Sequence, residues 1–258
     1  MSLNVPLKLT IKDELKTIAV IGDTHFPFHD PEAIDVMEDI LFEIQPDYLI
    51  YNGDIGDWYQ VSKFAKDPVR ISQLQNDLDM VKTMFAYHGL MLPNTRRIFI
   101  KGTHENRWEK WLWQRTPETA GLESNAVESL YGLKNNGIEC VEFEQGLLVN
   151  GVFLILHGNI VSIHSAYTAK RQFERNGGCG ICNHTHRGGS FYKRDRFGTW
   201  GWWVNFCLCS LNPDWIQNPN WQQGFSLVHF TGSKRFWVEQ IPIINHEALY
   251  NGKLYGGG

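Results

Sequence analysis

Short apolar runs alternate with segments of helical periodicity through the first half of this sequence. Three runs have the length and apolar character of buried strands: 17–22 (TIAVIG), 47–53 (DYLIYNG) and 97–101 (RIFIK). Three further segments show helical spacing or composition: 31–43, 71–90 and 105–115. Asp30 and Pro31 suit the N-cap and the first position of the first helix. The alternation predicts a β-α-β-α-β unit with parallel strands.

Strand-like runs dominate the second half. They are 138–143, 147–149, 152–156, 179–183, 191–193, 199–208, 225–230 and 236–241. Asn150-Gly151 predicts a hairpin turn between the second and third runs, and 162–176 predicts a helix. Because no linker or repeat separates the halves, we expect one domain over residues 1–258, with an α/β fold of two stacked sheets and helices outside. The strand- and tryptophan-rich part, 188–245, is expected to complete the second sheet.

Composition narrows the class of protein. The 258 residues are 43% hydrophobic and 20% charged, which is ordinary for a globular protein. No apolar run approaches the roughly 18 residues that cross a membrane, and the first residues, MSLNVPLKLTIKDELK, contain no apolar signal core. We therefore expect a cytoplasmic protein with no membrane partner.

The cysteine and tryptophan residues admit two interpretations each. Cys179-x-x-Cys182 and Cys207-x-Cys209 have the composition of a four-thiolate zinc site, but both pairs lie in apolar runs, where cysteine behaves as a small hydrophobic residue. The second interpretation is the better one, and the odd total of five cysteines also argues against a disulfide framework. Packing is likewise favoured over a base-stacking platform for five tryptophans: Trp200, Trp202, Trp203, Trp215 and Trp221.

Charge is distributed unevenly along the chain. The net charge is −4, which argues against a general nucleic-acid coat. Residues 163–196, however, contain seven basic and two acidic residues, a local net charge of +5. Such a run is usually a solvated face. Here it surrounds two histidines that are candidate ligands, so it also predicts a rim that attracts anions.

The candidate chemistry lies at the ends of the predicted strands. Asp and His follow five of them, in the clusters Gly22-Asp23-Thr24-His25, Gly53-Asp54-Ile55-Gly56-Asp57, Gly102-Thr103-His104-Glu105, Leu156-His157-Gly158 and Asn183-His184-Thr185-His186. In α/β sheets ligands collect at the carboxyl ends of the strands. Carboxylates and neutral imidazoles bind divalent first-row metals, and two adjacent ions can clamp a phosphate. Any one cluster is weak evidence, whereas five in this order predict a dinuclear metal site.

These residues resemble the motifs of the calcineurin-like metallophosphoesterases. The family order is D-x-H, G-D-x-x-D, G-N-H-[DE], H and G-H-x-H, and the resemblance spans roughly residues 17–187. HSAYTA at 164–169 and NPNWQQGF at 218–225 are also similar to phage and bacterial members of unassigned substrate. The resemblance implies a four-layer α-β-β-α sandwich of two mixed sheets flanked by helices.

The resemblance also implies a site with two divalent ions, drawn from Mn, Fe, Zn or Ni. The implied metal ligands are Asp23, His25 and His186 for the first ion, Thr103, His157 and His184 for the second, and Asp54 between them. A metal-bound hydroxide would attack phosphorus in line, while His104 would assist the leaving group and Asp57 would orient His104. Arg187, and with less support Asn106 and Arg107, would contact the phosphate. Glu105 would be a structural partner near the site rather than a base.

Two positions depart from the family pattern. Thr103 stands where the family has Asn, whose amide oxygen binds the second ion, and Asn183 replaces a Gly before the last histidine pair. A hydroxyl is shorter and a weaker ligand than an amide oxygen. We therefore expect a weakened second metal site and some crowding of the backbone at Asn183.

The sequence thus predicts a metal-dependent phosphoesterase acting on phosphomonoesters or phosphodiesters. Its substrate would be a phosphorylated small molecule or a nucleic acid. Two alternatives remain open: a metal-binding pseudoenzyme that recognises a phosphorylated ligand, motivated by Thr103, and a nuclease acting on DNA or RNA ends. The presence of His104 and Asp57 favours an enzyme, because a protein that only binds has no need of an acid.

Overall fold

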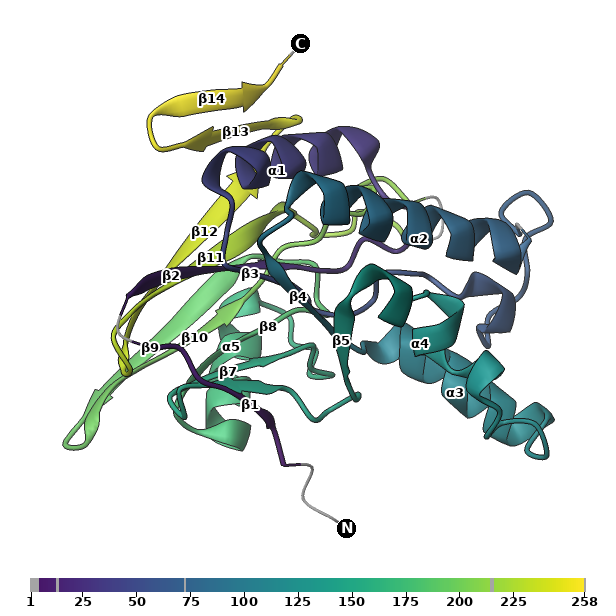
Figure 1. Ribbon diagram of the computed structural model, residues 1–258, viewed down its shortest axis with the longest axis horizontal. Helices are drawn as coiled ribbons and strands as arrows, with labels where there is room; N and C mark the ends of the chain where they lie inside the picture. Colours follow the sequence, from purple (N-terminus) through teal and green to yellow (C-terminus); the bar gives the residue numbers. More distant parts are fainter. Residues whose placement is uncertain (1–4, 13, 72, 214–215, 258) are drawn as a thin grey trace.

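Two six-stranded sheets pack against each other and carry helices on their outer faces (Figure 1). The computed structural model describes residues 5–12, 14–71, 73–213 and 216–257. Within them, no helix has both the length and the apolar character needed to cross a bilayer. The predicted four-layer sandwich of two mixed sheets is confirmed.

The first sheet holds the alternating half of the chain. Its strand order is β12-β11-β2-β3-β4-β5. The strands are β2 (Leu15–Ile21), β3 (Tyr48–Tyr51), β4 (Arg96–Ile100), β5 (Ile138–Val141), β11 (Gln223–Thr231) and β12 (Arg235–Ile243). Strands β2 to β5 pair in parallel, and β11 joins β2 antiparallel. The carboxyl ends of the parallel strands therefore lie along one edge, as the sequence predicted.

The second sheet has the order β1-β6-β7-β8-β10-β9. Its strands are β1 (Leu7–Leu9), β6 (Leu147–Val149), β7 (Phe153–Leu156), β8 (Cys179–Cys182), β9 (Gly189–Asp195) and β10 (Gly198–Val204). Strands β7, β8 and β10 are parallel, whereas β6–β7 and β9–β10 are hairpins. Asn150 and Gly151 both have positive φ, at 50° and 70°, as the tight turn between β6 and β7 requires.

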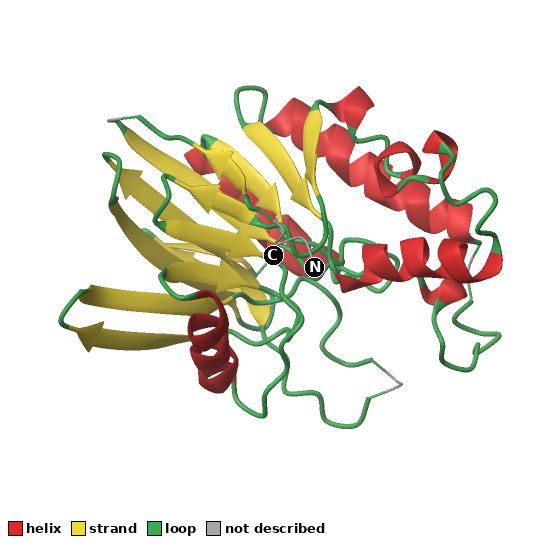
Figure 2. Ribbon diagram, turned by 90° about the horizontal axis from the view of Figure 1, so that it is seen from below, coloured by secondary structure: helices red, strands yellow, loops and turns green. Residues whose placement is uncertain are grey.

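Helices form the two outer layers (Figure 2). They are α1 (Pro31–Ile44), α2 (Leu74–Met91), α3 (Thr103–Arg115), α4 (Val127–Leu130) and α5 (Ser165–Asn176), with 3-10 turns at Tyr59–Val61, Glu123–Asn125 and Lys134–Asn136. Helices α1 and α2 lie on the first sheet and α5 on the second. Asp30 caps α1 by accepting a hydrogen bond from the Ala33 N–H at 3.2 Å. A C-terminal hairpin, β13 (Glu247–Tyr250) and β14 (Lys253–Gly256), lies beside α1.

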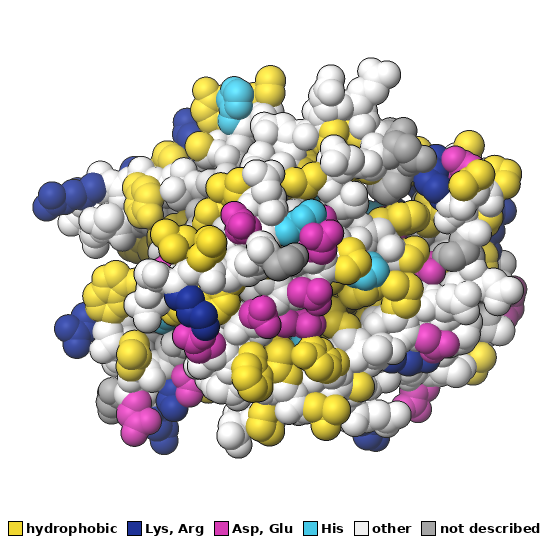
Figure 3. Space-filling model, turned by 90° about the horizontal axis from the view of Figure 1, so that it is seen from above, with side chains coloured by type: hydrophobic (Ala, Val, Ile, Leu, Met, Phe, Trp, Pro, Cys, Tyr) yellow, Lys and Arg dark blue, Asp and Glu magenta, His cyan; other side chains and the backbone are white. Residues whose placement is uncertain are grey.

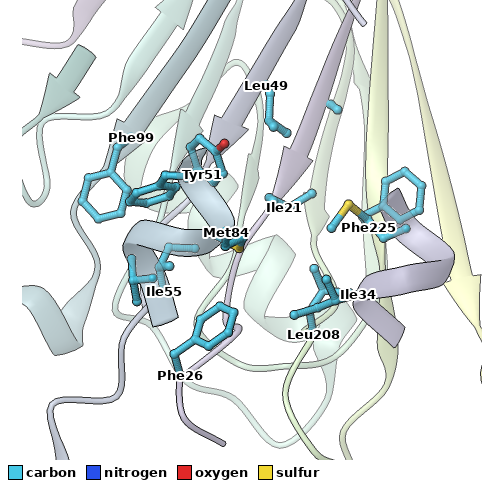
Figure 4. Packing of buried hydrophobic residues seen from close by; sticks show 14 of the residues in the cluster. Ile21, Phe26, Ile34, Leu49, Tyr51, Ile55, Met84, Phe99, Leu208 and Phe225 are labelled. Carbon is cyan, nitrogen blue, oxygen red and sulfur yellow. The ribbon is translucent and has the colours of Figure 1, made fainter. Parts of the chain in front are cut away.

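Alternation along β2 shows how the layers are packed. Ile18 and Val20 belong to the apolar core between the two sheets, where they are joined by Phe153 of β7. Ala19 and Ile21 point the other way, into the core beneath α1 and α2. Figure 4 shows this second core, with strand residues meeting Ile34 of α1. Both faces of the strand are buried, which explains why the sequence shows a continuous apolar run.

The structure corrects several boundaries. Strand β10 ends at Val204, not at residue 208, because Asn205 turns from one sheet to the other: its amide donates to the Val20 carbonyl at 2.9 Å. Within 188–245, strands β9 and β10 complete the second sheet as expected, whereas β11 and β12 join the first sheet. Strands β1, β13 and β14 were not predicted. Trp202 and Trp203 are buried, which confirms their packing role, while Trp215 lies outside the described residues.

Candidate metal centre

The loops after five strands bring the predicted ligands to one place. Asp23 and His25 follow β2, Asp54 follows β3, Thr103 begins α3 directly after β4, and His184 and His186 follow β8. His157 follows β7, beside β8. The ligand atoms form two groups, each with members within 4.8 Å of one another: Asp23, His25 and His186, and Asp54, His157 and His184.

The first group presents three ligand atoms to a common point. The Nε2 atoms of His25 and His186 lie 3.0 Å apart. Oδ1 of Asp23 lies 3.6 Å from Nε2 of His186 and 3.9 Å from Nε2 of His25, yet this buried oxygen has no hydrogen-bond partner. A buried carboxylate oxygen without a donor is costly unless a cation faces it. The geometry therefore suits a divalent ion between these three side chains.

The second group has the same character. Nδ1 of His157 donates to the Asn52 carbonyl at 2.7 Å, which leaves Nε2 facing the cluster. That Nε2 lies 3.1 Å from Oδ2 of Asp54 but makes no hydrogen bond. Burial lowers the pKa of His157, but the Asp54 carboxylate outweighs burial and raises it to about 10. The Asp54 carboxylate therefore favours positive charge at this Nε2, which is where a metal ion would bind.

Thr103 lies inside this second group. Its hydroxyl donates to Oδ2 of Asp54 at 2.9 Å and is 3.4 Å from Nδ1 of His184. The hydroxyl thus reaches the cluster. Asp54 groups with His157 and His184, so the predicted bridge from Asp54 to the first ion remains a prediction.

Left-handed backbone recurs at the predicted ligands. Five of the predicted ligands have left-handed φ values, in a region that residues other than glycine rarely adopt. They are Asp23 (52°), His25 (52°), Asp54 (53°), His184 (79°) and His186 (58°). Such strain persists only where the surrounding structure enforces it, and it is typical of functional sites.

Glu105 fixes the loop that carries Asp54. Its buried carboxylate accepts backbone N–H groups of Asp54 at 2.9 Å, Ile55 at 3.1 Å and Gly102 at 2.8 Å, and the Tyr131 hydroxyl at 3.0 Å. These donors come from three separate segments. The predicted role of Glu105 as a structural partner rather than a base agrees with this arrangement.

Asn183 is accommodated without crowding. Its amide donates to Oδ2 of Asp23 at 3.1 Å and accepts from the amide of Asn52 at 2.7 Å. A side chain at Gly22 would approach within 2.8 Å of this amide, so the glycine provides the room that Asn183 needs. Asn183 therefore orients the Asp23 carboxylate, and the expected backbone strain at this position is not observed.

His104 stands next to both clusters and is oriented by its neighbours. Nδ1 donates to the Asp57 carbonyl at 2.6 Å and lies 3.3 Å from the Asp57 carboxylate. Nη2 of Arg107 lies 2.9 Å from Nε2 of His104. The same Nε2 lies 4.0 Å from Oδ2 of Asp54. Burial lowers the pKa of His104, but the Asp54 and Asp57 carboxylates outweigh it and raise the pKa above its usual value.

Two predicted phosphate contacts lie elsewhere. The Arg187 guanidinium donates to the backbone carbonyls of Ser162 at 2.9 Å and Ile163 at 2.8 Å, because the 160s loop folds against it. Asn106 is buried within α3. Neither residue lines the cavity that opens beside the clusters, nor do the basic residues of 163–196. The cations at this cavity are Arg70 and Arg107. The sequence offered Arg107 as a weaker candidate for a phosphate contact, but it did not single out Arg70.

The cavity has a volume of about 440 Å³ and reaches the first cluster. His25, His104 and His186 are among its lining residues. Its walls are mainly apolar and aromatic: Phe28, Tyr59, Phe64, Ile216 and Trp221. The Trp221 ring meets the His186 ring edge to face, with centroids 4.4 Å apart. The volume lies in the range of small-molecule sites.

The model of one protein family, described as the calcineurin-like phosphoesterase family, matches residues 16–217. This chain belongs to that family. Two curated relatives are the Gene 54 proteins of Mycobacterium phages D29 and L5, which are 25% and 24% identical to the phosphoesterase described here. Each alignment covers 93% of this chain and 98% of the relative.

Solved structures with a similar arrangement include two proteins of low sequence identity. One is Vps29 from Entamoeba histolytica complexed with Zn²⁺ (13% identity, 92% of this chain and 95% of that chain, TM-score 0.45). The other is the purple acid phosphatase PPD1 from yellow lupin (9% identity, 90% of this chain and 52% of that chain, TM-score 0.45).

Members of the phosphoesterase family depend on divalent metal ions, and the donors of this chain fit such ions. The orphaned Oδ1 of Asp23 and the facing Nε2 and Oδ2 atoms of His157 and Asp54 are what a binuclear site would require. Of the residues that hold these ligands in place, the sequence missed Asn52, which carries no motif signal. Glu105 stood within a motif and was predicted as a structural partner.

Proposed function

We propose that this protein is a metal-dependent phosphoesterase whose substrate carries a bulky apolar or aromatic group on its phosphate. The observation that carries the proposal is the position of His104, which faces two ligand clusters and lines an apolar cavity that reaches the first of them. When bound, the metal ions would neutralise the phosphate and activate water. Asp23, His25 and His186 would hold one ion, and Asp54, His157 and His184 the other, with Thr103 beside it.

The remaining groups have distinct roles in the proposed reaction. His104 presents Nε2 toward the clusters while its Nδ1–H is held by Asp57. This geometry lets Nε2 deliver a proton to the departing oxygen. Nη2 of Arg107 lies at hydrogen-bond distance from Nε2 of His104, which can accept this hydrogen bond only in the neutral ring. Once His104 is protonated, the Arg107 guanidinium can turn to the phosphate.

The cavity supports the proposed substrate class. A phosphate group alone would leave most of the 440 Å³ unfilled. The aromatic wall offers stacking to a ring, which contributes about 1–3 kcal/mol per ring for nucleic-acid bases. Arg70 and Arg107 supply positive charge at the same cavity.

The nuclease alternative has less support from the surface. Acidic side chains gather on the face formed by α1 and the C-terminal hairpin (Figure 3). Arg171 and Arg175 of the basic segment donate to local groups of the 159–162 loop. A strongly salt-dependent affinity for oligonucleotides would nevertheless favour the nuclease.

The test of activity uses Mn²⁺-loaded protein with p-nitrophenyl phosphate and its bis ester. We expect hydrolysis of at least one ester. Since p-nitrophenolate leaves without a proton, His104→Ala should slow phenyl phosphate more strongly than p-nitrophenyl phosphate, by a further factor of about ten or more. Metal binding without turnover of any ester would favour the pseudoenzyme instead.

The test of substrate class compares binding of methyl phosphate and phenyl phosphate by calorimetry. We expect phenyl phosphate to bind more tightly, and Phe64→Ala to remove most of that advantage. Phe197→Ala is the matched control, because Phe197 is 74% exposed, like Phe64 at 76%, but lies on the β9–β10 turn. Equal binding of the two esters by the wild-type protein would exclude the proposed class while leaving the activity intact.

A further inference from the structure

The cysteine pair that follows β10 lies against one of the candidate ligands. After Val204 the chain continues extended, and bridges at Cys207 and Cys209 join it to Gln223 and His29. Because alternate residues of an extended segment share a face, both thiols point the same way. Leu208, between them, points into the apolar core near Ile34 (Figure 4).

Both thiols face His186. Ligand atoms of His186, Cys207 and Cys209 lie within 4.8 Å of one another, and all three residues are buried. Sγ of Cys209 is 3.9 Å from Nδ1 of His186. The other ring nitrogen, Nε2, belongs to the first cluster, 3.6 Å from Asp23. The imidazole thus has carboxylate and imidazole neighbours on one side and two sulfur atoms on the other.

We propose that Cys207, Cys209 and Nδ1 of His186 form a separate binding site for a thiophilic ion, with Zn²⁺ as the best candidate. A set of two thiolates and one imidazole binds Zn²⁺ in preference to Mn²⁺ or Mg²⁺. Each thiol loses its proton when the ion binds, and His186 also loses its ring proton when both of its nitrogens hold ions; these protons go to solvent.

The surroundings give the site an entry path and an open position. Cys209 and His186 line the 440 Å³ cavity, whereas Cys207 is fully buried and donates to the Gln222 carbonyl at 3.4 Å. An ion can therefore enter from the cavity. Its fourth coordination position would remain open to the cavity. Because the ion shares the ring of His186 with the first cluster, occupancy of the two sites is coupled.

The other buried pair shows that sulfur alone does not make such a site. Cys179 and Cys182 lie on β8, where Sγ of Cys179 accepts a hydrogen bond from the Gly201 N–H at 3.4 Å. Among the described residues, neither belongs to a group of potential metal ligands. The four cysteines therefore do not form the four-thiolate site that their spacing allowed, and Cys179 provides a matched control.

The experiment is a Co²⁺ titration of the reduced, metal-free protein, followed by the thiolate-to-cobalt charge-transfer absorption. We expect a band in the wild type, its loss in Cys207→Ser and Cys209→Ser, and its retention in Cys179→Ser. Zn²⁺ affinity should fall more than about tenfold in Cys209→Ser. Mn²⁺ affinity of the same variant should stay within about twofold, because Mn²⁺ prefers oxygen and imidazole ligands.

Absence of the band in the wild type, or its retention in both serine variants, would overturn the proposal. If a serine variant does not fold, X-ray absorption of the zinc-loaded wild type decides. Sulfur ligands at about 2.3 Å support the site, and a shell of only nitrogen and oxygen excludes it. None of these measurements depends on phosphoester hydrolysis, so the proposal stands or falls separately from the proposed function.

Discussion

Replacing Thr103 by Asn tests whether the second metal cluster lacks a ligand. The Thr103 hydroxyl donates to Oδ2 of Asp54 at 2.9 Å and lies 3.4 Å from Nδ1 of His184. An Asn side chain is one atom longer and would place an amide oxygen among Asp54, His157 and His184. A fourth protein ligand should strengthen binding of the second ion by about ten- to a hundredfold, or roughly 1.4–2.8 kcal/mol.

The same change should weaken the metal-free protein. The lost hydrogen bond has a charged acceptor, so its removal costs about 1.5–3 kcal/mol of unfolding free energy. Thr103→Val, which keeps the shape and removes the hydroxyl, is the control. It should show the same loss of stability in EDTA and no gain in metal affinity.

Calorimetric titration with Mn²⁺ measures the affinity, and urea denaturation in EDTA measures the stability. Two ions should bind to Thr103→Asn under conditions in which the wild type binds one tightly and the other weakly. If the second ion binds Thr103→Asn no tighter than it binds the wild type, the idea that Thr103 weakens this cluster is wrong.

Three further predictions concern the groups around the clusters. Glu105→Gln should lower the unfolding free energy by about 3–6 kcal/mol, because at least two hydrogen bonds to a charged acceptor are lost and the new amide N–H₂ group faces backbone donors. A loss below about 1 kcal/mol in urea denaturation would contradict this expectation. Since the pKa of His104 is raised, the imidazole stays protonated at pH values above the ordinary pKa of histidine. Activity should therefore fall as the pH rises through this raised pKa. Asp57→Asn removes one of the carboxylates that raise it, so this alkaline limb should move to lower pH in a kcat profile, and an unmoved limb would exclude the role of Asp57. Gly102→Ala should abolish tight metal binding in calorimetry, because its Cβ would collide with the Asp54 carboxylate, whereas Gly137→Ala, with no atom within 4 Å of the new Cβ, should leave metal affinity unchanged.

The sequence by itself located most of the fold and the ligands. Apolar runs identified β2, β3 and β4 because parallel strands buried on both faces leave a continuous signal. Asp and His at the ends of these runs pointed to one sheet edge, since parallel strands end together. Edge strands such as β1 and the β13–β14 hairpin escaped prediction because short, half-exposed strands have no comparable pattern.

Tertiary structure decided which residues meet. Three contacts could not be read from the pattern of apolar and polar positions along the chain. They are those of Arg187 with the 160s loop, of Arg107 with His104, and of Cys209 with His186. The left-handed backbone of Asp23 or His184 is likewise invisible in the sequence, because these residue types do not require it. Residue type thus determined the chemistry available at the sheet edge. The packing of two sheets against each other decided how His104, Thr103 and the thiols face the ligand clusters, because these distances depend on loops contributed by both sheets.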